Sequence, residues 1–98
     1  MRGPRRWRQE RKTYLMRNYG ITVAQYNKML KRQHGRCAIC KRPPRSRHLS
    51  VDHDHISGRI RGLLDYRCNR FIVGRHRDGR LLQEAADYLN SDFDGRFI

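Results

Sequence analysis

Two segments near the N-terminus have the hydrophobic pattern of helices. Apolar residues recur at helical spacing after Thr22, and Thr22 with Gln25 three residues later forms the sequence of a capping box, so a helix is expected from there to about Gln33. Upstream, good helix formers over residues 11–18 lead to Gly20, which can take the left-handed conformation that ends a helix. The apolar face of the later helix comprises Val23, Tyr26, Met29 and Leu30.

A β-hairpin is predicted in the middle of the chain. Leu49 and Val51 alternate with polar neighbours, residues 57–58 (Ser-Gly) supply a turn, and Ile60 begins a second apolar strand that runs to Leu64. Because one strand follows the other after a short turn, the pair should be antiparallel.

Two helices are predicted after the hairpin. Cys68 opens a short helix that ends near Gly74, and residues 78–79 (Asp-Gly) mark a turn before a last helix over residues 81–89. Its apolar side chains fall on one face, which we expect to lie in the core. That face comprises Leu82, Ala85, Ala86 and Leu89. Short strands followed by helices give an α+β class.

The charge balance limits the classes of molecule that this protein is expected to bind. Lys and Arg number 23 against 9 acidic residues, for a formal charge of +14 and a pI near 11.0, which points to a polyanion and above all to nucleic acid. Residues 2–12 are largely basic and read as a mobile arm or as the solvated start of the first helix. No apolar run resembles a signal peptide or a membrane span, so we expect no membrane partner and a cytoplasmic location.

Cysteine usage favours a metal over disulfides. The chain has three cysteines, an odd number, and Cys37 and Cys40 stand at the Cys-x-x-Cys spacing of a metal chelate, with zinc the first candidate. A domain of 98 residues buries a small core, so such a staple would add useful stability.

The densest group of reactive side chains lies in the predicted hairpin and just after it. Residues 51–55 read Val-Asp-His-Asp-His, residues 61–64 read Arg-Gly-Leu-Leu, and Cys68-Asn69 follows at a helix start. With the Cys-x-x-Cys upstream, this order resembles the phage recombination endonuclease VII family, and the likeness covers most of the chain. It also takes in residues 19–22, 35–40 and 85–89.

The resemblance implies a fold and an activity. The expected fold is a small ββα-metal (HNH, or His-Me finger) nuclease core with a zinc knuckle and flanking helices. Residues 1–20 would form a basic N-terminal arm with a short helix, and residues 21–98 a zinc-stapled nuclease domain. The implied protein is a phage protein acting in the bacterial host, or a bacterial one.

The second zinc knuckle departs from the family pattern. Where the family has Cys-x-x-Cys, this chain has Asp65 at the first position and Cys68 at the second. Since a carboxylate is an accepted zinc ligand, we expect Cys37, Cys40, Asp65 and Cys68 to hold one structural Zn²⁺. The alternatives are a three-thiolate site completed by water, weakened zinc binding, or a core without metal.

The hairpin residues suit hydrolysis of a phosphodiester, which needs a cation and an activated water. Asp52 and Asn69 carry hard oxygen ligands for a catalytic Mg²⁺ or Mn²⁺, the role that the resemblance implies for them. His53 is the expected general base, because an imidazole titrates near neutral pH. His55 would touch the phosphate or orient its neighbours, and Asp54 would be a supporting or solvent residue. Since side chains alternate along a strand, a site that uses both Asp52 and His53 requires a strand end or a distortion.

Basic residues beside these groups are expected to grip double-stranded or branched DNA through its phosphates, with weak sequence preference and steep salt dependence. They are Arg59, Arg61, Arg67 and Arg70. The leading hypothesis is a DNA endonuclease that works through one metal ion. A non-catalytic zinc-knuckle DNA-binding module or regulator and an RNA-directed nuclease remain open. Family members resolve branched DNA as dimers built by segments beyond the nuclease module. Pairing of two chains through the N-terminal helices, to give a homodimer, is left open here, and junction resolution is a weaker expectation than DNA cleavage.

Overall fold

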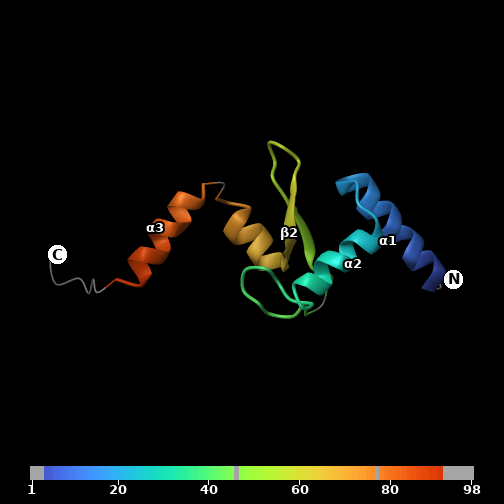
Figure 1. Cartoon of the computed structure of the whole chain (residues 1–98), viewed down its shortest axis with the longest axis horizontal. Coiled ribbons are helices and arrows are strands. Elements are labelled where there is room, and N and C mark those ends of the chain that lie inside the picture. The colour runs from blue at the N-terminus through green and yellow to red at the C-terminus, as the bar shows by residue number, and fades with distance from the viewer. Residues whose placement is uncertain (1–3, 46, 77, 92–98) are drawn as a thin grey trace.

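The computed structural model describes residues 4–45, 47–76 and 78–91, which form an α+β arrangement of helices around a two-stranded sheet. The molecule is elongated, with extents of 64 × 29 × 25 Å, and Figure 1 shows the hairpin between two helices on one side and α3 on the other. The elements in order are α1 (Pro4–Tyr19), α2 (Val23–Arg32), β1 (Ser50–His53), β2 (Ile60–Leu64), the π-helix η1 (Cys68–Val73) and α3 (Gly79–Leu89).

The end signals predicted for the two N-terminal helices are confirmed. Gly20 ends α1 with a φ of +68°, and the Thr22 and Gln25 side chains each accept a hydrogen bond from the other's backbone N–H, at 3.1 and 2.8 Å. Helix α1 begins at Pro4, so the basic segment is the start of this helix and not a separate arm over its described part. The Arg11 guanidinium lies 4.4 Å from the centre of the Tyr26 ring and joins α1 to α2.

The predicted hairpin is confirmed, with β1 and β2 antiparallel. Residue Asp54 holds the turn, because its carboxylate accepts the backbone N–H groups of Ile56 and Ser57 at 2.8 and 3.0 Å. The positive φ of Gly58, +75°, completes the reversal. The expected supporting role of Asp54 is therefore a local one, in the turn.

A glutamine connects α2 to the sheet. Gln33 caps the C-terminus of α2, and its side chain donates to the carbonyl of Leu63 at 2.9 Å and accepts the Leu63 N–H at 2.9 Å. Gly62 allows this approach, since a Cβ there would lie 3.3 Å from the Gln33 Oε1. The side chain thus pairs with β2 much as a neighbouring strand would.

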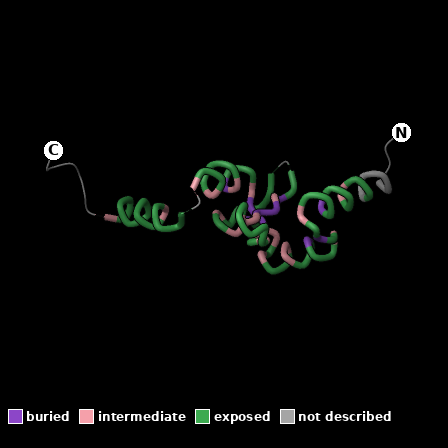
Figure 2. The backbone as a smooth tube through the Cα atoms, turned by 90° about the horizontal axis from the view of Figure 1, so that it is seen from above, coloured by how far each residue is buried: buried purple, intermediate pink, exposed green. Residues whose placement is uncertain are grey.

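The core is small and central, as the buried segments of Figure 2 show. Leu15, Cys37 and Leu63 are almost fully buried. Leu49 and Val51 are buried as the predicted alternation requires, but the polar neighbour Asp52 is buried as well. Helix α1, the first cysteine turn and the hairpin therefore share one hydrophobic cluster. That cluster places the cysteines beside the sheet.

The C-terminal part confirms one prediction and contradicts another. The helix predicted from Cys68 to about Gly74 is present as η1, which winds as a π-helix, and a Cβ on Gly74 at its end would lie 2.5 Å from the Asn69 carbonyl. The apolar face of α3 is not in the core: none of its described residues is buried, and Leu89 is 79% exposed. Helical periodicity shows that a face is apolar, but it does not show that another element covers it.

Candidate metal centre and hairpin site

Four potential metal ligands converge where the two predicted knuckles meet. The Sγ atoms of Cys37, Cys40 and Cys68 and a carboxylate oxygen of Asp65 all lie within 4.8 Å of one another. In a tetrahedral zinc site with Zn–S bonds of about 2.3 Å, ligand atoms stand about 3.8 Å apart. A contraction of about 1 Å at most would complete such a site, so the cluster is compatible with structural zinc.

Asp65 joins the two knuckles through both of its oxygens. Its Oδ2 accepts a hydrogen bond from the Cys40 Sγ at 2.9 Å, and its Oδ1 accepts the Cys68 backbone N–H at 2.8 Å. The thiol of Cys40, followed by the backbone N–H of Cys68, lowers the pKa of the Asp65 carboxyl. An ionised carboxylate among three thiols is the donor set that a divalent cation of intermediate softness prefers.

The thiols of the cluster respond to their surroundings in different directions. Burial and the Asp65 hydrogen bond raise the pKa of Cys68, and the Asp65 hydrogen bond raises that of Cys40. For Cys37, burial acts to raise the pKa, but hydrogen bonds from backbone amides and Cys40 outweigh it and lower the pKa. Hydrogen bonds to its sulfur thus set Cys37 apart from the other two thiols of the cluster.

The second group lies at the end of β1, where two histidines and two tyrosines form a row. The His53 and His55 ring centres are 4.7 Å apart, and the Tyr19 ring meets His53 at 5.7 Å with an interplanar angle of 61°. Tyr14 continues the row, with its hydroxyl 3.5 Å from that of Tyr19. Burial, with the neighbouring Tyr14, raises the pKa of Tyr19 to about 12, so its hydroxyl stays protonated.

Asp52 is buried and already paired. Its carboxylate accepts two hydrogen bonds from the Arg61 guanidinium, Nε to Oδ2 at 2.7 Å and Nη2 to Oδ1 at 3.0 Å. The two side chains of this ion pair differ in exposure: 44% of the Arg61 side chain is accessible to solvent, but only 10% of the Asp52 side chain. Hydrogen bonding to Asp52 raises the pKa of Arg61, so the guanidinium remains charged.

An irregularity of the sheet occurs at this point. Asp52 pairs with Gly62 but His53 pairs with Ile60, so Arg61 is one residue more than the ladder needs. The sequence requires a strand end or a distortion if one site is to use both Asp52 and His53. Both features are present, because β1 ends at His53 and its register shifts at that step.

The remaining expected residues are distributed around these two groups. Asn69 is the second residue of η1 and is half-buried, next to the buried Cys68. Arg59 and Arg67 are exposed, as expected for phosphate contacts, and so is Arg70, which lies 5.8 Å from the centre of the Tyr66 ring. Whether these residues contact DNA stays a prediction.

Sequence reasoning missed three contacts around the sites. Tyr19 beside His53, Gln33 against β2, and the Arg47 guanidinium 4.6 Å from the centre of the Tyr66 ring were not expected. Each is a long-range contact made by a residue type that is common on surfaces, so only the Tyr19-Gly20-Ile21-Thr22 part of the resemblance hinted at one of them.

Comparison with known proteins identifies the family. The profile described as recombination endonuclease VII matches residues 12–91, which include both groups of residues. The chain belongs to this family. It is also 48% identical over 79 residues to the Gene 59 protein of Mycobacterium phage D29, and 42% identical over 79 residues to the Gene 59 protein of Mycobacterium phage L5.

These alignments cover 79% of this chain but 48% of each phage protein, so the chain spans about half the length of these relatives. No solved structure matches it. Among the helices formed by the described residues, none is both long and apolar enough to cross a bilayer.

Proposed function

We propose that this chain is a metal-dependent DNA endonuclease in which His53 acts as the general base. Membership of the endonuclease VII family supports DNA cleavage. The observation that carries the mechanism is the row of rings at the end of β1, where His53 lies against both His55 and Tyr19. Contacts with two rings restrict the orientation of the His53 imidazole, which favours proton transfer from a positioned water.

Each side chain of the hairpin site has a proposed task. The His53 imidazole takes a proton from the attacking water, and His55 contacts the phosphate or orients His53. The Asp52 carboxylate and the Asn69 carbonyl would hold Mg²⁺ or Mn²⁺, because both are hard oxygen donors. When bound, the cation neutralises phosphate charge and stabilises the leaving oxygen. This is the one-metal reaction expected of a ββα-metal nuclease.

The ion pair at Asp52 sets a condition for this proposal. Arg61 donates one hydrogen bond to each Asp52 oxygen, and its positive charge opposes a second cation there, so the carboxylate would hold Mg²⁺ or Mn²⁺ best when the guanidinium gives up at least one hydrogen bond. The Arg61 side chain is partly exposed, so it can turn toward solvent or toward a DNA phosphate. Arg61 would then exchange one anion for another as the substrate arrives.

The metal cluster has a structural role in the same proposal. Zn²⁺ held by Cys37, Cys40, Asp65 and Cys68 would fix the start of η1, where Asn69 follows Cys68 directly. Thiolates on both knuckles would tie the turn before the hairpin to the helix after it. A small core would gain stability from such a staple.

DNA would be bound mainly by charge. With a formal charge of +14, the protein should lose affinity steeply as salt is added. Exposed Arg59, Arg67 and Arg70 are the proposed phosphate contacts near the site. Branched DNA, a homodimer and a cytoplasmic location in a phage-infected or bacterial cell remain part of this proposal.

A plasmid-nicking assay with Mg²⁺ tests the function. The parent should convert supercoiled DNA to nicked or linear forms, and His53→Ala should bind DNA with parental affinity but cut at least about 100-fold more slowly. His76→Ala, outside both sites, is the matched histidine control and should cut normally. Equal rates for His53→Ala and the parent would defeat the mechanism, and adding linear and four-way-junction DNA would define the preferred substrate.

A non-catalytic DNA-binding module is the second candidate, and one observation favours it. The bidentate hydrogen bonding of Arg61 to Asp52 satisfies the carboxylate without any cation. A binder would show tight, salt-sensitive DNA binding and no cleavage with Mg²⁺ or Mn²⁺. An active zinc-loaded parent eliminates this candidate.

A further inference from the structure

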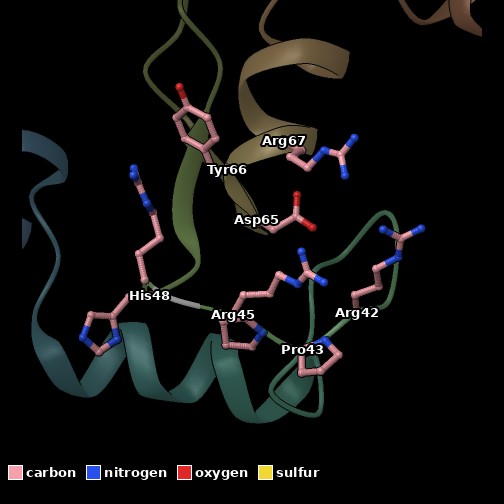
Figure 3. Close-up of a pocket in the computed structure, with 9 residues that line it drawn as sticks. Arg42, Pro43, Arg45, His48, Asp65, Tyr66 and Arg67 are labelled. Atoms are coloured by element: carbon pink, nitrogen blue, oxygen red, sulfur yellow. The ribbon is translucent and has the colours of Figure 1, made fainter.

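A basic cavity lies beside the metal cluster and apart from the hairpin histidines. Its volume is about 610 Å³, and Figure 3 shows it between the loop that follows the first knuckle and the residues that follow β2. Four arginines line it, Arg42, Arg45, Arg47 and Arg67. Asp65, the proposed zinc ligand, is the one acidic group among the described lining residues.

Tyr66 gives the cavity an aromatic surface. The Phe71 ring meets the Tyr66 ring edge-on, with centres 6.1 Å apart and an interplanar angle of 87°, and fixes its orientation. The Arg47 guanidinium lies over the ring at 4.6 Å, and 39% of Tyr66 is exposed. A flat cation on this face shows that the face is accessible to a planar group.

The combination of arginines with an exposed aromatic ring is suited to a nucleotide. Arginines bind phosphate, and bases stack on aromatic rings at sites that hold single-stranded nucleic acid. The volume lies within the range of about 300–1,000 Å³ usual for small-ligand sites, so one nucleotide fits and a duplex does not. In a duplex both faces of each base are already stacked, so only an unpaired base can use the Tyr66 ring.

We propose that this cavity binds one unpaired nucleotide of a DNA strand, with the base on Tyr66 and the phosphate on the surrounding arginines. This inference rests on the proposed function in taking DNA as the partner. The base replaces the Arg47 guanidinium on the ring, and Arg47 turns to the phosphate. Because Asp65 and Cys68 flank residues 66–67, zinc binding would also steady Tyr66 and Arg67.

Fluorescence of 2-aminopurine tests the inference. DNA with a single unpaired 2-aminopurine, and a matched fully paired duplex, are titrated with zinc-loaded protein without added Mg²⁺ or Mn²⁺. The parent should quench the unpaired probe by stacking. Tyr66→Leu should abolish the quenching and weaken binding of the unpaired DNA at least about fivefold, with less than about a twofold effect on the paired duplex.

Two further variants separate stacking from charge. Arg47→Met should keep the quenching and make the salt dependence of binding shallower by about one unit of slope, because one phosphate contact is lost. Tyr88→Leu, on the exposed α3, is the matched tyrosine control and should change neither readout. Zinc content and circular dichroism establish that each variant is folded.

Several outcomes would overturn the inference. Absence of quenching by the parent would do so whatever the variants show, and so would an equal loss of paired and unpaired DNA by folded Tyr66→Leu. Plasmid nicking by the parent judges the nuclease separately. A protein that cuts without quenching defeats the cavity alone, and one that quenches without cutting defeats the nuclease alone.

Discussion

Replacing Asp65 separates the two tasks of its carboxylate. In the parent, Oδ1 accepts the Cys68 backbone N–H while Oδ2 contacts the Cys40 thiol as part of the metal cluster. Asp65→Ala removes both functions. Asp65→Ser keeps a short oxygen acceptor for the N–H but removes the proposed charged zinc ligand, and Asp65→Cys supplies a thiolate, the ligand found in the family pattern.

The expected magnitudes follow from these contacts. The hydrogen bond to the Cys68 N–H resembles a helix N-cap, so its loss should cost about 1 kcal/mol of unfolding free energy even without metal. Outer-shell changes weaken metal sites by about 10–100-fold, and removal of a direct ligand should cost at least as much, or about 1.4–2.7 kcal/mol. With zinc bound, Asp65→Ala should therefore lose roughly 2–4 kcal/mol.

The assay combines two measurements. Competition with a chromophoric chelator gives the zinc affinity, and chemical denaturation with saturating zinc or with excess chelator gives the free energy of unfolding. Asp65→Ser should match the parent in chelator to within the cap energy, yet bind zinc as weakly as Asp65→Ala. Asp65→Cys should bind zinc at least as tightly as the parent.

Parental zinc affinity in Asp65→Ala would refute this reasoning, since three thiolates and water would then suffice. So would an equally stable parent with and without chelator, because the cluster would then contribute nothing to folding. An equal loss of stability by Asp65→Ala in saturating zinc and in chelator would support the cap and reject the ligand.

Three further predictions test other contacts. Gln33→Ala should cost about 1–3 kcal/mol, because the buried Leu63 N–H loses its partner, while Gln83→Ala on α3 should cost under about 0.5 kcal/mol in the same denaturant series. Two backbone N–H groups lower the pKa of Asp54. The ionised carboxylate therefore contributes to the free energy of unfolding above its ordinary pKa of 3.8, and this contribution is lost as pH falls through the lowered pKa. Acid unfolding should be less steep in Asp54→Asn; identical curves would contradict this. Arg61→Met should lower the Mg²⁺ concentration for half-maximal nicking by about fivefold, because a competitor for Asp52 worth about 1 kcal/mol is gone. A higher requirement would mean that Arg61 helps to hold the cation site.

Local sequence signals predicted the structure correctly where the backbone conformation depends on residues close by in the chain. The capping box of Thr22 and Gln25, the glycine that ends α1 and the hairpin turn at Gly58 all depend on neighbours within a few residues. The metal cluster was also predictable, because the spacing of Cys37 and Cys40 and the family pattern around Cys68 specify the ligands before any fold is known.

The sequence could not show what depends on distant partners. The bidentate contact of Arg61 with Asp52 crosses the hairpin at a register shift, and no residue pattern shows which strand carries the extra residue. The exposure of α3 was mispredicted for a similar reason, since amphipathic spacing is the same whether or not a partner is present. The catalytic assignments of His53 and Asn69 stay predictions.

The extra residue of β2 makes the two strands of the hairpin unequal in their tolerance of length changes. Deleting Arg61 would remove the register shift and keep the pairing of the sheet, but the buried Asp52 would lose its counter-charge. Shortening β1 by one residue would instead shift the His53 and His55 imidazoles relative to Tyr19. The effect of an insertion or deletion in this hairpin should therefore depend on the strand in which it falls. A deletion at Arg61 in β2 keeps the pairing of the sheet, whereas a deletion in β1 displaces the histidines.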